Sequence, residues 1–244
     1  MDKQVDLNYK MRSILVDWLV EVHHKYKLQT STLWLCVNII DRYLCVELIK
    51  RGKLQLVGVA ALFISCKFEE VYPPESKDFV HITDNAYTHS ELLKMETDIL
   101  SALNYEILVP TGFHFLSRYL NCIKASDNTR LLANYYAERN LQESHVLEVK
   151  PRVLAASAVY AALKQQEERY VDFLNSSKET CWNKTLQEES NLKENDLIDC
   201  AKLLIKYVGT ETETTSKRKL IATKKKYSTD RFHNVALLHE PTII

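Results

Sequence analysis

Hydrophobic residues near the start of the chain recur at helical spacing. Over residues 9–27, one face of a helix with about 3.6 residues per turn is apolar and carries Met11, Ile14, Leu15, Trp18 and Val22. Arg12 falls inside this apolar arc, where a charged group requires a partner. The pattern predicts a helix that is either largely buried or leaves apolar surface available to a partner.

The same spacing predicts three further helices in the first half of the chain, over about residues 31–48, 53–70 and 88–103. The second of these is apolar nearly all round, which is typical of a central helix packed on every side. Pro73 and Pro74 end this stretch, because proline cannot continue a helix. Thr88 followed by Glu91 is the pattern of a capping box and predicts the start of the third helix.

A second set of helices is predicted after Pro110, over about residues 111–124, 128–143, 151–166 and 194–208. The run LAASAVYAALK at 154–164 parallels GVAALFISCK at 58–67 when Lys164 is aligned with Lys67. This match indicates two copies of one helical unit, each around an Ala-rich central helix. We expect the polar stretch 209–217 to be a linker and the tail 218–244 to pack back as a short helix plus an extended end.

The composition supports an all-helical protein that is soluble and intracellular. Hydrophobic residues make up 46% of the chain, while Gly and Pro number only 4 and 5. The net charge is +0, which disfavours a general nucleic-acid binder. Six cysteines without a C-x-x-C pair fit a reducing compartment, nucleus or cytosol. The N-terminus lacks a signal core, and the longest near-apolar run, 54–66, is too short to span a bilayer.

Sequence patterns of catalysis are missing. The chain contains no Gly-rich phosphate loop, no H-E-x-x-H, no G-x-S-x-G and no kinase catalytic loop. Its histidines are scattered apart from His23 and His24, for which we expect a solvated role near a helix end and not metal ligation. An interaction module is therefore favoured over an enzyme, and no metal or cofactor is expected.

Several motifs together resemble the cyclin box of A- and B-type (G2/mitotic) cyclins. They are MRSILVDWLVEV (11–22), DRYL (41–44), RGKLQLVG (51–58), CKFEE (66–70), YPPE (72–75) and ITDNAYT (82–88), followed by SALNYEILVPTGFHFL (101–116) and KKKYSTDRFHNVALL (224–238). The resemblance implies an all-α cyclin fold with two tandem five-helix repeats, each around a central buried helix. It divides the chain into a first repeat (1–108), a second repeat (109–210) and a tail (211–244).

The resemblance implies a regulatory subunit that binds and activates a cyclin-dependent Ser/Thr kinase, controls cell-cycle progression at G2/M or S/G2, and is not itself an enzyme. Lys67 and Glu96 look like the charged pair that grips the kinase's regulatory helix. The apolar part of that contact would be lined by Ile64, Phe68, Leu100, Tyr105 and Ile107. For Lys67 alone, a cation that stabilises a helix C-terminus is the competing interpretation.

The resemblance also implies a patch that docks substrates or inhibitors with Arg-x-Leu segments. Its residues would be Met11, Ile14, Leu15, Trp18, Leu54 and Gln55, with Glu21, Arg51, Ile82 and Asp84 at the rim. Ordinary core packing is the alternative for the same helix face. The chain departs here from A-type cyclins, which carry acidic residues just beyond the position of Glu21, where this chain has His23, His24 and Lys25.

Arg12 and Asp41 resemble the family's buried ion pair between the first two helices, which answers the need of Arg12 for a partner. Only ten residues precede Met11, whereas the resemblance implies a longer N-terminal region, so the chain is expected to be a fragment or a short member.

We expect the protein in nucleus and cytoplasm, with no membrane and no direct nucleic-acid contact. Rival hypotheses are a cyclin-fold DNA- or peptide-binding adaptor, expected to have a basic surface and no Lys67/Glu96 pair, and a transcription-type cyclin.

Overall fold

A computed structural model describes residues 3–171, 181–209 and 220–237. Within these ranges the regular elements are helices, as predicted, and no strand occurs. The chain divides into two compact units, Met1–Thr111 and Gly112–Ile244. None of the described helices combines the length and the apolar character needed to cross a membrane.

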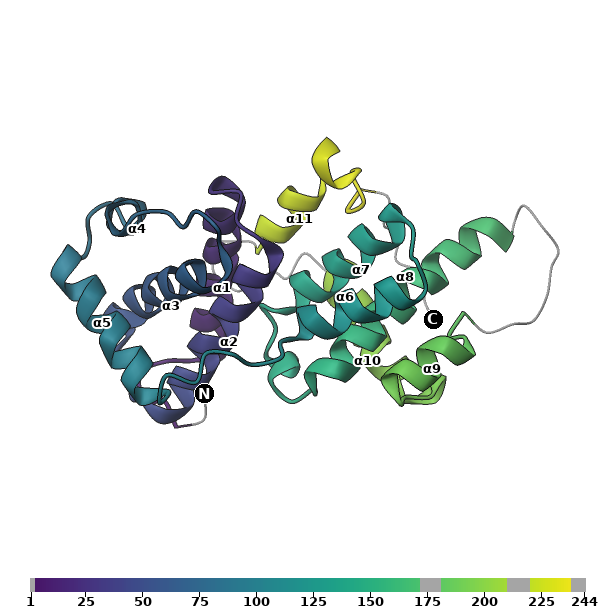
Figure 1. Ribbon diagram of the computed structural model, residues 1–244, viewed down its shortest axis with the longest axis horizontal. Coiled ribbons are helices and arrows are strands. Elements are labelled where there is room, and N and C mark those ends of the chain that lie inside the picture. Colours follow the sequence, from purple (N-terminus) through teal and green to yellow (C-terminus); the bar gives the residue numbers. More distant parts are fainter. Residues whose placement is uncertain (1–2, 172–180, 210–219, 238–244) are drawn as a thin grey trace. The chain divides into compact units, whose positions relative to one another are not determined.

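The first unit contains five α-helices and one short 3-10 turn: α1 (Tyr9–Lys25), α2 (Thr30–Val46), η1 (Arg51–Lys53), α3 (Leu54–Glu69), α4 (Ser76–Ile82) and α5 (His89–Ala102). Helix α3 lies at the centre, and α1, α2, α4 and α5 pack around it (Figure 1). Almost every side chain of α3 is buried up to Cys66, because the helix is apolar nearly all round. The central position predicted for this segment is confirmed.

Two local features of the first unit explain where its helices meet and start. A Cβ added at Gly58 on α3 would lie 2.7 Å from Leu15 Cδ1, so α1 approaches α3 at a position without a side chain. The capping box predicted at the start of α5 is present, with Thr88 and Glu91 each accepting a backbone N–H of the other. Hydrogen bonds from Lys53 and Thr88 lower the pKa of Glu91 to about 2.

The second unit repeats this plan around α8 (Pro151–Val171). Its other helices are α6 (Gly112–Cys122), α7 (Asp127–Asn140), α9 (Lys184–Ser190), α10 (Ile198–Gly209) and α11 (Ala222–Tyr227). Helices α6, α7 and α10 pack against α8, and α11 packs against α7. The second central helix is thus confirmed, and α6 to α10 supply the five helices of a second repeat.

Several predicted boundaries were wrong. Helix α8 continues to Val171 instead of ending at 166, and the segment predicted as one helix over 194–208 is a 3-10 turn (Glu194–Asp196) followed by α10. The short helices α4 and α9 were not predicted. Gly209 still belongs to α10, and the rest of the predicted linker 209–217 lies outside the described residues. Of the tail, α11 packs on the second unit, and residues 238–244 are not described.

Candidate functional site

An ion pair joins the last turn of α3 to the middle of α5. The Lys67 ammonium donates a hydrogen bond to Oε1 of Glu96, and it also lies 4.3 Å from the centroid of the Phe63 ring. The Lys67 side chain is 44% exposed, whereas that of Glu96 is only 11% exposed. The Glu96 side chain is therefore largely enclosed by the protein, while the Lys67 side chain is open enough to meet an acidic group of a partner.

The apolar residues expected around this pair fall into two classes. Phe68 and Tyr105 are 48% and 67% exposed, and Leu100 is half-buried. Ile64 and Ile107 are buried in the core of the first unit, so they support the surface from beneath. A partner bound here would contact Phe68 and Tyr105 directly. We call Lys67, Phe68, Glu96, Leu100 and Tyr105 the α3–α5 patch.

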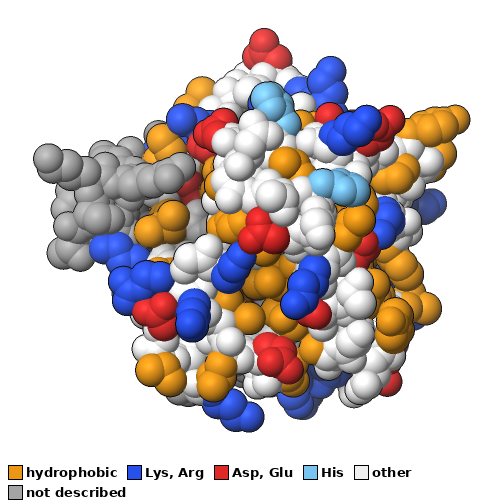
Figure 2. Space-filling view, turned by 90° about the vertical axis from the view of Figure 1, so that its left-hand side faces the viewer, with side chains coloured by type: hydrophobic (Ala, Val, Ile, Leu, Met, Phe, Trp, Pro, Cys, Tyr) orange, Lys and Arg blue, Asp and Glu red, His pale blue; other side chains and the backbone are white. Residues whose placement is uncertain are grey.

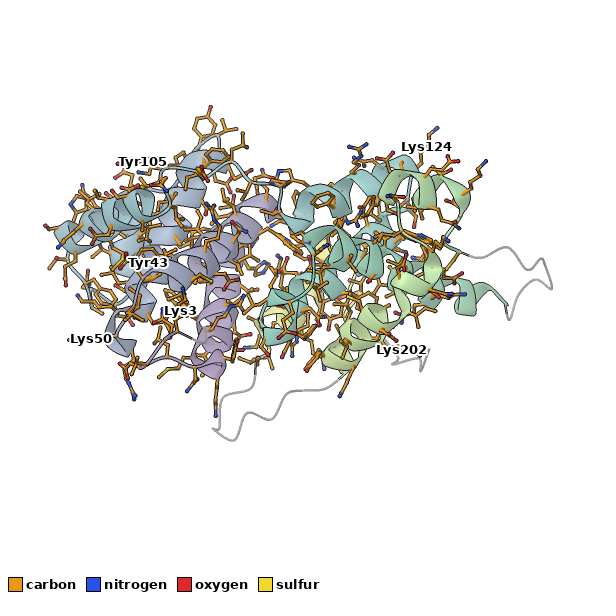
Figure 3. The ribbon with its side chains drawn as sticks, turned by 90° about the horizontal axis from the view of Figure 1, so that it is seen from below. Lys3, Tyr43, Lys50, Tyr105, Lys124 and Lys202 are labelled. Atoms are coloured by element: carbon orange, nitrogen blue, oxygen red, sulfur yellow. The ribbon has the colours of Figure 1, made fainter. Side chains whose placement is uncertain are left out.

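The backbone after α5 holds Tyr105 at the surface. Asn104 and Tyr105 have φ angles of 50° and 59°, in the left-handed region that is uncommon for a bulky side chain. The Tyr105 N–H donates to the Leu100 carbonyl at 2.8 Å, which closes the turn at the end of the helix. A conformation of this kind costs energy and persists where surrounding contacts enforce it. Figure 3 shows Tyr105 on the first unit.

Three exposed apolar residues in the loops that follow α3 and α5 were not predicted. Val71 and Tyr72 directly follow α3 and are 83% and 92% exposed, and Leu108 is 81% exposed. Figure 2 looks onto the side of the first unit that carries α5 and shows hydrophobic side chains at the surface among charged ones. Clustered exposed apolar residues mark interaction surfaces. Because these residues lie in loops, helical periodicity could not identify them.

The predicted docking residues differ in their exposure to solvent. Leu15 and Leu54 are buried where α1 meets α3, as the core-packing alternative requires. The other apolar members and Gln55 are half-buried: Met11, Ile14, Trp18, Gln55 and Ile82. Glu21, Arg51 and Asp84 are exposed. The face of α1 thus has both roles, since it packs inward through Leu15 and leaves Met11 and Trp18 partly open to solvent.

Two rim features alter the expectations for this patch. Arg51 binds Asp6, with its Nε 2.7 Å from Oδ1 and its N–H 2.8 Å from Oδ2, and these hydrogen bonds lower the pKa of Asp6. His23 is buried, with its Nε2 2.8 Å from the Gln29 carbonyl, so its expected solvated role is wrong. His24 is half-buried. Glu21, three residues after Trp18, is the exposed acidic side chain of α1, because the other acidic residue of this helix, Asp17, is buried.

Arg12 on α1 and Asp41 on α2 form an ion pair with two hydrogen bonds. The Arg12 Nε lies 2.6 Å from Oδ1 of Asp41, and a terminal guanidinium nitrogen lies 2.7 Å from Oδ2. Arg12 is 1% exposed and the Asp41 side chain 21% exposed. Such a bidentate geometry satisfies a buried guanidinium and fixes the crossing of the two helices. The Arg12 side chain is buried and Asp41 is only partly exposed, which suits a structural role.

The site contains no arrangement for metal chemistry. In the part of the chain that the structure describes, no group of three or more His, Cys, Asp or Glu side chains could hold a metal ion. The geometry on the first unit is instead that of a contact surface, with exposed aromatic residues, a charged pair at its centre and buried residues that hold both in place.

Comparison with known proteins agrees with this description. The family model for the N-terminal domain of cyclins matches residues 1–108, and that for the C-terminal domain matches residues 110–241. Cyclin-B1-1 of Oryza sativa subsp. japonica is 40% identical over 97% of the chain. G2/mitotic-specific cyclin S13-7 of Glycine max is 38% identical over 98% of the chain. The chain spans 51% of the length of the first relative and 87% of the second.

Solved structures share the fold at low sequence identity. A viral cyclin from herpesvirus saimiri superposes with a TM-score of 0.72 at 21% identity, covering 84% of this chain and 87% of the viral protein. A chain of the CAK complex from Chaetomium thermophilum bound to ATP-gamma-S gives a TM-score of 0.53 at 16% identity, covering 95% and 78%. Both cyclin domains are matched in order over nearly the full sequence, and the chain therefore belongs to the cyclin family.

Proposed function

We propose that this chain is a regulatory subunit that binds and activates a cyclin-dependent Ser/Thr protein kinase in the cell-division cycle, without catalytic activity of its own. The observation that carries the proposal is the α3–α5 patch, in which the ion pair between Lys67 and Glu96 stands beside the exposed rings of Phe68 and Tyr105. The relatives bear the names of B-type and G2/mitotic cyclins, which supports the same function.

The physical role of the patch is to stabilise one conformation of the kinase. Exposed apolar residues lose contact with water when a partner helix covers them, and the charged pair sets the register of that helix. If the patch binds the active position of the kinase's regulatory helix better than the inactive one, the active state becomes more populated. ATP and magnesium belong to the kinase, whose own Lys–Glu ion pair is completed by this movement.

Lys67→Glu tests the assignment. Because Lys67 is partly exposed, we expect the low end of the effect of breaking a charged contact, about 2 kcal/mol or roughly 30-fold in affinity for the kinase. Calorimetry with the kinase measures it. Lys202→Glu, on the exposed surface of α10, is the matched control and should bind like the parent. An unchanged affinity of Lys67→Glu would refute the assignment.

A charge swap separates contact with the kinase from support within the chain. The double variant Lys67→Glu/Glu96→Lys can re-form the ion pair inside the protein with its polarity reversed. If Lys67 acts only by holding α3 to α5, the swap restores kinase binding. If Lys67 meets an acidic group of the kinase, the swap leaves binding weak although the fold is intact, and this is the result we expect.

The absence of intrinsic catalysis is tested separately. The purified chain should not turn over ATP, whereas addition of the chain should raise the phosphorylation rate of a cyclin-dependent kinase on a short peptide. ATP turnover by the isolated chain that survives removal of contaminating kinase would contradict the proposed regulatory role.

We further propose that the open part of the α1 face docks substrates or inhibitors with Arg-x-Leu segments. Met11 and Trp18 are half-buried and offer apolar surface for the leucine, while exposed Glu21 offers a carboxylate for the arginine.

We propose nucleus and cytoplasm as the compartments of the protein and expect no direct contact with nucleic acid or membrane. The basic run 224–226 is poorly suited to import-receptor binding, because Lys226 is buried.

A further inference from the structure

The end of α2 presents apolar side chains that neither surface described above uses. Val46, the last residue of α2, is 58% exposed, and Leu48 in the following loop is 67% exposed. Val5, on the segment before α1, is 93% exposed. Loops at a protein surface are usually polar, and clustered exposed apolar residues indicate a binding surface. We call Val5, Val46 and Leu48 the α2-end patch.

A buried glutamine brings these residues together. Gln4 is 9% exposed, and its Nε2 donates to the carbonyls of Leu44 at 2.8 Å and Glu47 at 2.6 Å. Its Oε1 accepts the N–H of Ile49 at 3.0 Å. Val5 is the chain neighbour of Gln4, and Leu48 lies between two of the residues that Gln4 binds. The patch is thus held in shape before any partner arrives, which lowers the entropic cost of binding.

Positive charge borders the α2-end patch. Lys3 and Lys50 are exposed, and Figure 3 shows both on the first unit. The charge of Lys50 contributes to the lowered pKa of Asp6, which places Lys50 close to the segment that carries Val5. The next cation, Arg51, is already paired with Asp6. Because Arg51 and Asp6 pair with each other, the described residues 3–6 and 44–51 leave two lysines, Lys3 and Lys50, against one acidic residue, Glu47.

We propose that the α2-end patch docks a protein segment in which an aliphatic or aromatic residue is flanked by acidic residues. The apolar residue would cover Leu48 and Val46, and the carboxylates would approach Lys3 and Lys50. A second copy of the chain fits less well, because a two-fold contact would bring the same lysines toward each other.

The test uses the purified chain and a fluorescein-labelled synthetic peptide in which leucines are flanked by aspartates. Binding is followed by fluorescence polarisation. Leu48→Asp should weaken binding about 10-fold or more, because it places a like charge where the apolar anchor would rest. Leu237→Asp is the matched control, since Leu237 is 64% exposed in the second unit and receives the same chemical change. It should bind the peptide like the parent.

Charge variants and a peptide of opposite charge test whether acidic residues of the partner approach Lys3 and Lys50. Lys50→Glu should weaken binding and Glu47→Lys should strengthen it, and both effects should shrink as salt screens the charges. A peptide with lysines in place of the aspartates should bind at least about 10-fold more weakly to the parent. Equal binding of the two peptides would overturn the proposal.

Other occupants give distinguishable results. Failure of the acidic peptide to bind the parent, or equal losses in Leu48→Asp and Leu237→Asp, would overturn the proposal. Self-association of the chain in analytical ultracentrifugation, abolished by Leu48→Asp, would also overturn it. So would binding to phosphatidylserine vesicles that Leu48→Asp abolishes, if the acidic peptide does not bind. The proposal does not depend on kinase binding, because Leu48 and Val46 lie outside the α3–α5 patch.

Discussion

The two units follow one plan but place their polar groups differently. In each, a central helix rich in small and apolar residues is surrounded by others, α3 in the first unit and α8 in the second. The first unit leaves large apolar side chains such as Phe68, Tyr72 and Tyr105 exposed. Among the described residues of the second unit, the most exposed large apolar side chain is Leu237, in the tail, and polar groups such as Glu138 and Lys226 lie in the interior.

The buried ion pairs show the difference most clearly. Arg12 and Asp41 join two neighbouring helices in the first unit, and Asp41 keeps contact with water. Lys226 and Glu138 join the tail helix α11 to α7, with side-chain exposures of 3% and 0%. The Lys226 ammonium lies 2.7 Å from both carboxylate oxygens, and the Tyr227 hydroxyl donates to one of them at 3.1 Å. The second unit therefore uses buried polar groups to hold α11, whereas the first unit exposes the apolar side chains that we propose as contacts for partners.

The largest expected effect is the loss of the tail's ion pair. Lys226→Met leaves the Glu138 carboxylate buried, with Tyr227 as its remaining donor among the described residues, which should lower the free energy of unfolding by about 3–5 kcal/mol. Urea denaturation measures the change. Lys225→Met, at the exposed neighbouring position, should remain within about 0.5 kcal/mol of the parent. A loss below about 1 kcal/mol in Lys226→Met would mean that α11 contributes little to the second unit.

A double variant sharpens this result. Glu138→Gln/Lys226→Met removes both charges, and replacing a whole buried pair is often neutral where breaking it is not. We therefore expect the double variant to recover most of the stability lost in Lys226→Met. If it is no better, then the packing of the Lys226 side chain over Tyr227 and Phe232, and not its charge, holds the tail.

The matching change in the first unit should cost less. Arg12→Ala leaves Asp41 without the guanidinium that it binds, but the Asp41 side chain is in contact with water. We therefore expect the free energy of unfolding to fall by about 3 kcal/mol. Arg51→Ala removes an exposed Arg–Asp pair and should cost no more than about 1 kcal/mol. Both are measured by denaturation, alongside kinase binding. If Arg12→Ala is as stable as the parent but no longer binds the kinase, Arg12 belongs to an interface after all.

The sequence predicted those features that depend on neighbouring residues. The apolar pattern located both central helices, Thr88 with Glu91 located the start of α5, and the helical wheel required a partner for Arg12. The identity of that partner, Asp41, came from the family resemblance. The role of Lys67 rests on the same resemblance and is not settled by its pairing with Glu96.

Features that depend on distant contacts were missed. Helices α4 and α9 have seven residues each, too few for an apolar period to appear, although the Glu75/Asp78 capping box and the Asn183 cap mark their starts. Lys226 differs from its exposed neighbours Lys224 and Lys225 only because Glu138, 88 residues earlier in the chain, lies against it. A run of three lysines gives no local sign of this burial.

The first unit's role as a docking surface is tested by Met11→Ala/Trp18→Ala. Both side chains are half-buried, so we expect the double variant to lose about 2 kcal/mol of docking free energy. The KM for substrates carrying a distal Arg-x-Leu segment should therefore rise roughly 30-fold. Phosphorylation of a short peptide without that segment should be unchanged. A double variant too unstable to purify would show that this face serves packing. If the variant is stable and the kinase bound to it phosphorylates both substrates as with the parent, docking occurs elsewhere.

The smallest expected effect concerns a histidine in the second unit. His145 stacks on Tyr207 with ring centroids 4.7 Å apart, and both its ring nitrogens are buried without a hydrogen-bond partner. Burial lowers the pKa of His145 below its usual value of 6.5, and Arg139 acts in the same direction against the opposing charges of Glu143 and Glu148. The unfolded chain therefore binds the proton more readily than the folded one.

By linkage, the neutral form of His145 leaves the second unit fully stable above about pH 6.5, and stability falls as the pH drops below that value. His145→Phe preserves an aromatic stack on Tyr207 and removes the titration. Thermal unfolding of parent and variant at pH 7.5 and at about pH 5.5 should show that the parent loses more stability than the variant between the two values. If parent and variant lose the same stability between the two pH values, His145 is solvated in the folded state. The second unit would then admit water at η2 (Ser144–Leu147), although the groups around Glu138 are buried.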